Sequence, residues 1–257
     1  MIITRTPFRI SFFGGGTDYP VWYQENGGAV LGTTIDKYCY ITCRYLPQFF
    51  EHKHRIVYSH SELVNDIEEI HHPSVRETLR FMEINDGLEI HHDGDLPART
   101  GLGSSSSFTV GLLHALYALK GSIPSKMQLA QDTIHIEQNM IRENVGSQDQ
   151  TFAAFGGFNR ILFSGEPHID IKHVTVKSQR LKFLENHLML FFTGFSRTAS
   201  EIAEEQIKQT PNKKRELTEM YRMVDEAVNI LTEDNDLLEF GKLSCCSCIN
   251  SSVIFVI

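Results

Sequence analysis

The alternation of apolar and polar positions predicts strands in the first part of the chain. Residues 2–13 are rich in β-branched and aromatic side chains and end at Gly14, which is typical of a strand, and Pro7 favours an edge position or a bend. Residues 29–45 hold two apolar runs on either side of Asp36-Lys37, so they predict two strands joined by a turn. Shorter strands are expected at 55–59, 88–92 and 158–163.

Helices are predicted where apolar residues recur every three or four positions. Residues 104–120 are apolar on nearly all sides, which indicates a helix inside a domain. Residues 126–142 are amphipathic, and Glu137 falls on their apolar face. An inward carboxylate is costly unless a cation or strong donors meet it, so Glu137 is either a metal or active-site ligand or part of a buried ion pair. A shorter helix is expected at 75–84.

The order of these elements predicts a fold class and a domain boundary. Strands on one side and the helix at 104–120 on the other predict a two-layer α+β domain. We place its end at residue 177, which divides the chain into residues 1–177 and 178–257. In the second part the apolar run 188–193 predicts a buried strand, and the helices that follow within 197–234 have amphipathic patterns typical of packing.

Composition narrows the classes of function. The chain has 257 residues, of which 41% are hydrophobic and 22% charged, and a formal net charge of −8 that argues against nucleic acid as a main partner. No apolar run approaches the roughly 20 residues of a membrane span, and the N-terminus lacks a secretory signal. We therefore expect a cytoplasmic protein with no membrane partner. The five cysteines show no spacing typical of a disulfide framework.

A glycine and serine loop leads directly into the predicted helix at 104–120. Gly101 and Gly103 permit left-handed backbone and a close approach to a ligand, and serines 104 to 107 occupy the first helical turn. The pattern fits a phosphate cradle, although an ordinary serine-capped helix explains it equally well. No Gly-Lys-Ser/Thr follows, so it is not a Walker loop, and the third glycine of a dinucleotide fingerprint is missing.

Asp149 is the second acidic candidate. It stands near the start of a short predicted helix that follows Gly146-Ser147 and ends at Gly156-Gly157. A helix cap alone would explain it. Because it lies twelve residues after Glu137 across a loop, it can also return to the same pocket.

Three segments in this order resemble the GHMP small-molecule kinases: residues 5–19, the loop 97–107, and Glu137 with residues 146–150. Within that superfamily, residues 14–18, 148–159 and 192–200 look most like the D-glycero-D-manno-heptose 7-phosphate kinases. The resemblance implies a GHMP kinase fold, with an N-terminal domain like domain 2 of ribosomal protein S5 and a ferredoxin-like C-terminal domain. It covers residues 1–243.

The resemblance also implies a set of site residues, with ATP and Mg²⁺ as cofactors. Asp149 would stand beside the attacking sugar hydroxyl, and Arg9 would be the cation near the transferred phosphoryl group. Arginine does not readily release a proton, so the role of Arg9 would be electrostatic. Ser105 and Glu137 would bind the metal. The loop residues that would hold the ATP phosphates are Pro97, Gly101, Leu102, Gly103, Ser104, Ser105 and Ser106, and those that would bind the sugar are Asp18, Gly15, Gly16 and Thr17.

The implied reaction is phosphorylation of the anomeric hydroxyl of D-glycero-D-manno-heptose 7-phosphate, a step in the synthesis of nucleotide-activated heptose. Arg197, Arg99 and Arg142 are candidates for the substrate phosphate by charge alone. One alternative is a kinase of an unphosphorylated sugar, similar to fucokinase or galactokinase.

The family has a third glycine-rich motif near its C-terminus that is absent here, so the second domain is expected to be incomplete. An inactive nucleotide-binding remnant is therefore a further alternative. The oligomeric state stays open, with a homodimer among the alternatives.

Overall fold

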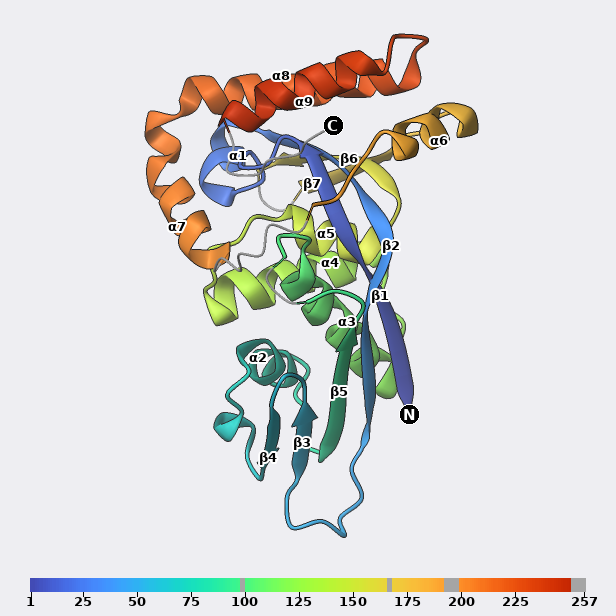
Figure 1. Ribbon diagram of the computed structural model, residues 1–257. Coiled ribbons are helices and arrows are strands. Elements are labelled where there is room, and N and C mark those ends of the chain that lie inside the picture. Colours follow the sequence, from blue (N-terminus) through green and yellow to red (C-terminus); the bar gives the residue numbers. More distant parts are fainter. Residues whose placement is uncertain (98–99, 166–167, 192–198, 251–257) are drawn as a thin grey trace. The chain divides into compact units, whose positions relative to one another are not determined.

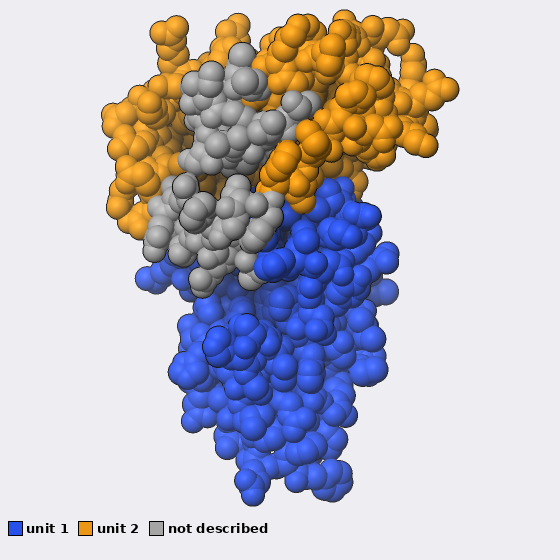
Figure 2. Space-filling view, in the orientation of Figure 1, with its two compact units in different colours: residues 1–9, 34–145, 149–156 blue, residues 10–33, 146–148, 157–257 orange. Residues whose placement is uncertain are grey.

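The computed structural model describes residues 1–97, 100–165, 168–191 and 199–250 (Figure 1). These residues form two compact units that interleave along the chain (Figure 2). Unit 1 comprises residues 1–9, 34–145 and 149–156, and unit 2 comprises residues 10–33, 146–148 and 157–257. The domain boundary expected at residue 177 stays a prediction.

Unit 1 is built on a β-sheet. Strand β1 (Ile2–Phe13) begins in it and pairs with β2 (Gly28–Tyr45). Within this unit the strand order is β4-β3-β5-β2, where β3 is His54–Val57, β4 is Ser61–Val64 and β5 is Leu88–Gly94. β5 runs antiparallel to β2 from Cys39↔Gly94 to Tyr45↔Leu88, and β3 runs parallel to β5. Apolar side chains alternate along these strands, so Cys39, Ile41 and Cys43 are buried together.

The helices of unit 1 provide the rest of its core. They are α2 (Pro73–Phe81), α3 (Ser104–Leu119), α4 (Lys126–His135), the π-helix η2 (Ile136–Ile141) and α5 (Gln148–Phe155), with a 3₁₀ turn at Ile67–Glu69. α3 is buried on nearly all sides, and Leu112, Leu113 and Leu116 are fully inaccessible. This confirms the helix predicted at 104–120 and the mixed helix–sheet fold class.

Unit 2 combines a small sheet with a helical part. Residues 28–33 of β2 pair antiparallel with β6 (Phe158–Ser164), and β6 pairs antiparallel with β7 (His168–His173). Its helices are α1 (Pro20–Asn26), α6 (Ser178–Asn186), α7 (Ala199–Gln209), α8 (Lys214–Thr232) and α9 (Leu238–Asn250), with a 3₁₀ turn at Thr210–Asn212. Phe240 of α9 packs edge-on against Phe12 and Phe13 of β1, with ring centroids 5.5 and 5.1 Å apart. None of the helices in the described part of the chain is long and apolar enough to cross a membrane.

Two predicted elements were wrong. The expected turn at Asp36-Lys37 is instead the exposed middle of one continuous strand, because β2 changes its partner there from β6 to β5. The apolar run from Leu188 was expected to be a buried strand. In the described residues 188–191 it has no regular structure, and Met189 is 62% exposed, since no strand of the described chain pairs with it.

Candidate active site

Arg9 and Asp149 form the ion pair at the centre of the candidate site. Arg9 comes from β1 and Asp149 from the first turn of α5, and both belong to unit 1. Arg9 Nε donates to Asp149 Oδ1 and Arg9 Nη2 to Asp149 Oδ2, both at 2.8 Å. The side chains are 13% and 27% exposed, so the pair is half-buried but open to a ligand. This two-point geometry fixes the carboxylate in one orientation.

The same arginine holds the glycine loop. Arg9 Nη1 donates to the Gly101 carbonyl at 2.6 Å, and the Arg9 backbone N–H donates to the Leu102 carbonyl at 3.0 Å. Gly103 has φ +74°, and a Cβ there would lie 3.1 Å from Arg9 Cγ and 3.5 Å from Asp149 Oδ2. Gly101 has φ +75° with open space around it. Glycine at 103 thus permits the contact between the loop and the ion pair.

The loop ends where α3 begins. Gly103 is the N-cap of α3 and provides no side chain to cap it, and the first helical bond runs from Ser107 N–H to the Gly103 carbonyl. The preceding N–H groups of the first turn therefore have no helical acceptor, which is the arrangement that binds anions at helix N-termini. Of the other predicted loop residues, Pro97 and Ser105 are exposed and Leu102 is buried.

Glu137 lies on the π-helix η2, and its predicted inward orientation is confirmed because it is only 1% exposed. Single π-turns in helices often mark functional sites. Ser106 Oγ donates to Glu137 Oε2 at 2.8 Å and Gln150 Nε2 donates to the same oxygen at 2.5 Å, whereas Oε1 is buried without a partner. Burial raises the pKa of Glu137 to about 7, while the neighbouring polar side chains of Thr109, Gln150 and Ser106 oppose that rise.

The predicted metal site fits a hard cation with oxygen ligands. No group of three His, Cys, Asp or Glu side chains that could hold a metal occurs among the described residues. A Mg²⁺ ion bound here would thus take few ligands from the protein and the remainder from phosphate oxygens and water, as Mg²⁺ commonly does. The unpartnered Oε1 of Glu137 suits that role. Ser105, predicted as the second ligand, is exposed, and its carbonyl accepts a bond from Thr109, so its contact with a metal stays a prediction. The neighbouring Ser106 donates to Glu137.

The residues predicted to bind the sugar belong to unit 2. Asp18 is 2% exposed, and its carboxylate accepts the N–H groups of Gly16 at 3.0 Å and Gln148 at 3.3 Å. Thr17 is fully buried, with its hydroxyl 2.7 Å from the Gly14 carbonyl. Asp18 therefore ties the Gly14-Gly15-Gly16 turn to the segment that precedes Asp149 in the sequence, and its contact with a sugar stays a prediction.

Sequence reasoning missed Gln150 and the contact of Ser106. A buried glutamine next to Asp149 has no distinctive sequence signal, and only the position of Glu137 on a neighbouring helix explains its burial. Of the three arginines considered for a substrate phosphate, Arg99 and Arg197 lie outside the described residues. Arg142 is exposed at the end of η2.

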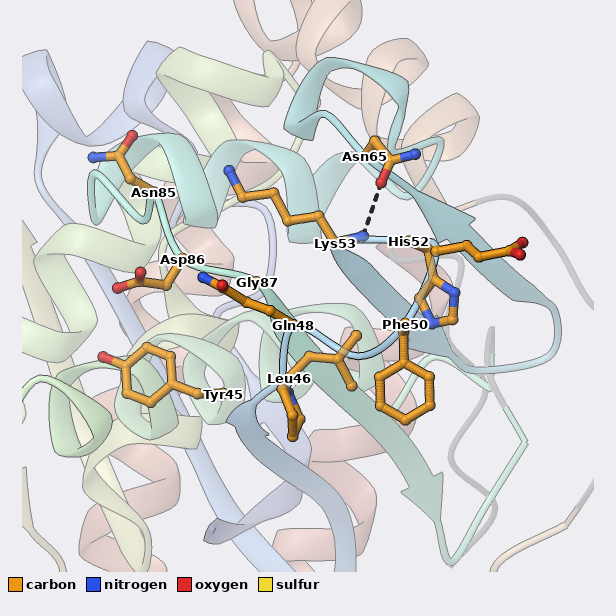
Figure 3. Close-up of a pocket in the computed structure, with 12 residues that line it drawn as sticks. Tyr45, Leu46, Gln48, Phe50, His52, Lys53, Asn65, Asn85, Asp86 and Gly87 are labelled. Carbon is orange, nitrogen blue, oxygen red and sulfur yellow. Dashed lines mark hydrogen bonds between the residues drawn. The ribbon is translucent and has the colours of Figure 1, made fainter.

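Unit 1 also has a hollow of about 620 Å³ that shares no residue with this site (Figure 3). Its wall includes Tyr45, Phe50, Asn65 and Asp86, and Lys53 is the single lysine or arginine among its lining residues. The Lys53 backbone N–H donates to Asn65 Oδ1 at 3.0 Å, as the dashed line shows. A phosphate-transfer site needs more positive charge or free N–H groups than this wall offers. The arrangement around Arg9 is the better candidate.

Comparisons with known proteins indicate the family to which this part of the chain is similar. Residues 70–157 match the family model for the N-terminal domain of GHMP kinases. The chain has a GHMP kinase N-terminal domain. The matched range contains the glycine loop, Glu137, Asp149 and Gln150, while Arg9 lies before it. Kinases of this kind are phosphotransferases with an alcohol group as acceptor, and the relatives below place this chain among them.

The relatives of this chain include enzymes that act on sugars. It is 26% identical over 257 aligned residues to the D-glycero-alpha-D-manno-heptose 7-phosphate kinase of Campylobacter jejuni, an alignment that covers 95% of this chain and 74% of that protein. It is 26% identical to the galactokinase of Pyrococcus furiosus, over 79% of this chain and 56% of the relative. The crystal structure of a D-glycero-D-manno-heptose 1-phosphate kinase from Bacteroides thetaiotaomicron has the same fold, with a TM-score of 0.79 at 20% identity over 98% of this chain and 80% of that one.

Proposed function

We propose that the chain is an ATP- and Mg²⁺-dependent sugar kinase that phosphorylates the anomeric hydroxyl of D-glycero-D-manno-heptose 7-phosphate, with the 1,7-bisphosphate as product. The observation that carries the proposal is the ion pair of Arg9 and Asp149 against the glycine loop. The similarity to a heptose 7-phosphate kinase over 95% of the chain supports the choice of sugar. A cytoplasmic location suits an enzyme that consumes ATP.

In this proposal the glycine loop and Arg9 hold the nucleotide phosphates. The N–H groups at the start of α3 lack helical acceptors and favour an anion. The Arg9 guanidinium reaches both the loop carbonyl of Gly101 and Asp149, so its positive charge lies where the phosphoryl group would transfer. Phosphoryl transfer depends mainly on positioning and charge neutralisation, and these groups supply both.

Glu137 and Ser105 would hold the metal, with Ser106 supporting Glu137. The Glu137 Oε1 atom is a buried oxygen without a partner, which is the feature that a cation would satisfy. When bound, Mg²⁺ neutralises charge on the phosphate oxygens.

Asp149 would receive the sugar hydroxyl. Its carboxylate accepts bonds from Arg9 at both oxygens and keeps lone pairs for a further donor, because an ionised carboxylate has about four acceptor sites. It would orient the hydroxyl and accept its proton as the new O–P bond forms. Asp18, with Gly15, Gly16 and Thr17, would bind the other sugar hydroxyls.

The test is phosphate transfer from ATP to a panel of sugars and sugar phosphates. We expect transfer to the heptose 7-phosphate, and we expect Asp149→Asn to abolish turnover while nucleotide affinity changes little. Asp86→Asn, at an exposed carboxylate outside the site, is the matched control and should keep wild-type turnover. Turnover that survives in Asp149→Asn would refute the role of Asp149, and no transfer to any sugar would refute the proposed function.

The alternative is a kinase of an unphosphorylated sugar, which the galactokinase relative favours. Inorganic phosphate discriminates between the two, because only a sugar-phosphate kinase needs a second anion site for which free phosphate can compete. An inactive remnant, the third possibility raised by the sequence, would be stabilised by Mg²⁺-ATP without turnover.

A further inference from the structure

The hydrogen bonds to Glu137 are unequally divided between its two carboxylate oxygens. Ser106 Oγ and Gln150 Nε2 both donate to Oε2, at 2.8 and 2.5 Å, and Oε1 is buried without a partner. The donors come from separate helices, since Ser106 is in the first turn of α3 and Gln150 in the first turn of α5. Glu137, Ser106 and Gln150 are 1%, 4% and 0% exposed, so water does not substitute readily for either donor.

Two donors from two helices restrict the rotation of the carboxylate. With Oε2 held on both sides, Oε1 remains the oxygen available to another group. A buried oxygen without a partner destabilises the folded protein, so the arrangement is explained best if a ligand satisfies Oε1 in the working protein.

Gln150 also joins the two acidic residues of the site. It follows Asp149 in the first turn of α5, and the two side chains contact different partners: Asp149 pairs with Arg9, whereas Gln150 binds Glu137. The first turn of α5 therefore provides Asp149, the carboxylate proposed to receive the hydroxyl. It also provides Gln150, which donates a hydrogen bond to Glu137, the carboxylate proposed to bind the metal.

We propose that Gln150, together with Ser106, is a positioning residue that fixes Glu137 Oε2 so that Oε1 is the ligand atom for a divalent cation. The inference rests on the proposed function in one respect, which is that the cation arrives with a nucleotide. It assigns Gln150 a role in metal affinity and gives it no contact with the substrate. Partners that orient a metal ligand in this way typically contribute 10- to 100-fold in metal affinity.

The test compares Gln150→Met with Gln128→Met. Methionine keeps the length of the side chain and removes the N–H donor. Gln128 is a matched control because its Nε2 also donates to a carboxylate, Asp132 Oδ1 at 2.6 Å, which in turn accepts the hydroxyl of Tyr117 at 2.7 Å. Gln128, Asp132 and Tyr117 lie outside the candidate site, so loss of this glutamine reports the structural effect of such a bond.

The readout is the thermal stabilisation of the protein by a non-hydrolysable ATP analogue, titrated with Mg²⁺ and repeated in EDTA. We expect the Mg²⁺ concentration at half-maximal stabilisation to rise about 10-fold or more in Gln150→Met, and to stay at the wild-type value in Gln128→Met. Stabilisation by the nucleotide in EDTA should be equal in all three proteins. Ser106→Ala, a smaller change, should raise the same midpoint and gives a second reading if Gln150→Met does not fold.

The outcomes separate this inference from the proposed function. A midpoint in Gln150→Met and Ser106→Ala within about twofold of wild type, which is well below the effect of a true supporting residue, would overturn the inference. A wild-type nucleotide complex that gains nothing from Mg²⁺ would overturn it as well. Mg²⁺-dependent stabilisation that needs Gln150, in a protein that phosphorylates no sugar, would support the inference and refute the proposed function.

Discussion

Replacing Glu137 by glutamine should make the metal-free protein less sensitive to pH while it abolishes metal-dependent activity. Burial raises the pKa of Glu137 to about 7 from an ordinary value of 4.5. The folded protein therefore binds the Glu137 proton more tightly than the unfolded chain does. Stability from this residue is fully present below the unfolded pKa and is lost as the pH rises through the folded pKa.

The size of the effect follows from the same shift. Between about pH 5 and pH 8 the wild-type protein should lose on the order of 2 to 3 kcal/mol of unfolding free energy through Glu137. Glu143 contributes in the same direction, because burial raises its pKa too. Glu137→Gln keeps Glu143, so the difference in pH dependence between the two proteins isolates Glu137. Glutamine can still accept the bonds from Ser106 and Gln150 through its carbonyl oxygen.

The assay is urea unfolding, followed by circular dichroism at both pH values in EDTA. Relative to wild type, Glu137→Gln should gain stability at the higher pH, and this advantage should disappear or reverse at the lower pH, where the native carboxyl is protonated. Parallel pH profiles for the two proteins would refute the reasoning, because they would mean that Glu137 titrates at an ordinary pKa. In the presence of Mg²⁺-ATP and sugar, the variant should show no turnover.

Four further substitutions test the loop, the ion pair and the packing around Asp18. Gly103→Ala and Gly101→Ala both force a left-handed alanine, at a cost of about 1 kcal/mol each. The melting temperatures of the two variants should fall by similar amounts. Because only a Cβ at position 103 contacts Arg9, kcat should fall mainly in Gly103→Ala, and equal kcat values for the two variants would contradict this. Arg9→Lys keeps the charge but loses the paired donors, so kcat should fall more than nucleotide affinity, as steady-state kinetics and calorimetry can show. Gly146→Ala would drive a Cβ into Asp18 Oδ2, and its unfolding free energy should fall by about 2 to 3 kcal/mol; a wild-type urea midpoint would contradict that packing.

Much of the fold could be predicted from local pattern, and the errors have a physical cause. The helix at 104–120 was predictable because an all-apolar helical segment has to be buried, and Glu137 was predictable because helical spacing puts it among apolar residues. The polar pair Asp36-Lys37 was misread as a turn, since a strand that exchanges partners has an exposed middle that looks the same in sequence. Residues 188–191 show the opposite error, in which an apolar run has no partner strand in the described chain.

The candidate site also has a part that could be predicted from the sequence and a part that could not. Arg9, Asp149 and the glycine loop come from segments far apart in the sequence, and the resemblance to GHMP kinases rather than any spacing rule predicted that they meet. Which serine of the first turn of α3 donates to Glu137 depends on the rotation of α3 relative to η2, which sequence periodicity does not determine. The partner of Gln150 depends on the same packing.

The central claim is that the chain transfers phosphate from ATP to the anomeric hydroxyl of a heptose 7-phosphate. Phosphorus NMR of a reaction with ATP, Mg²⁺ and D-glycero-D-manno-heptose 7-phosphate tests it most directly. The account predicts a new anomeric phosphate signal beside the retained 7-phosphate, together with formation of ADP, and neither in Asp149→Asn. Transfer to unphosphorylated sugars with none to the heptose 7-phosphate, or no transfer to any sugar, would contradict it.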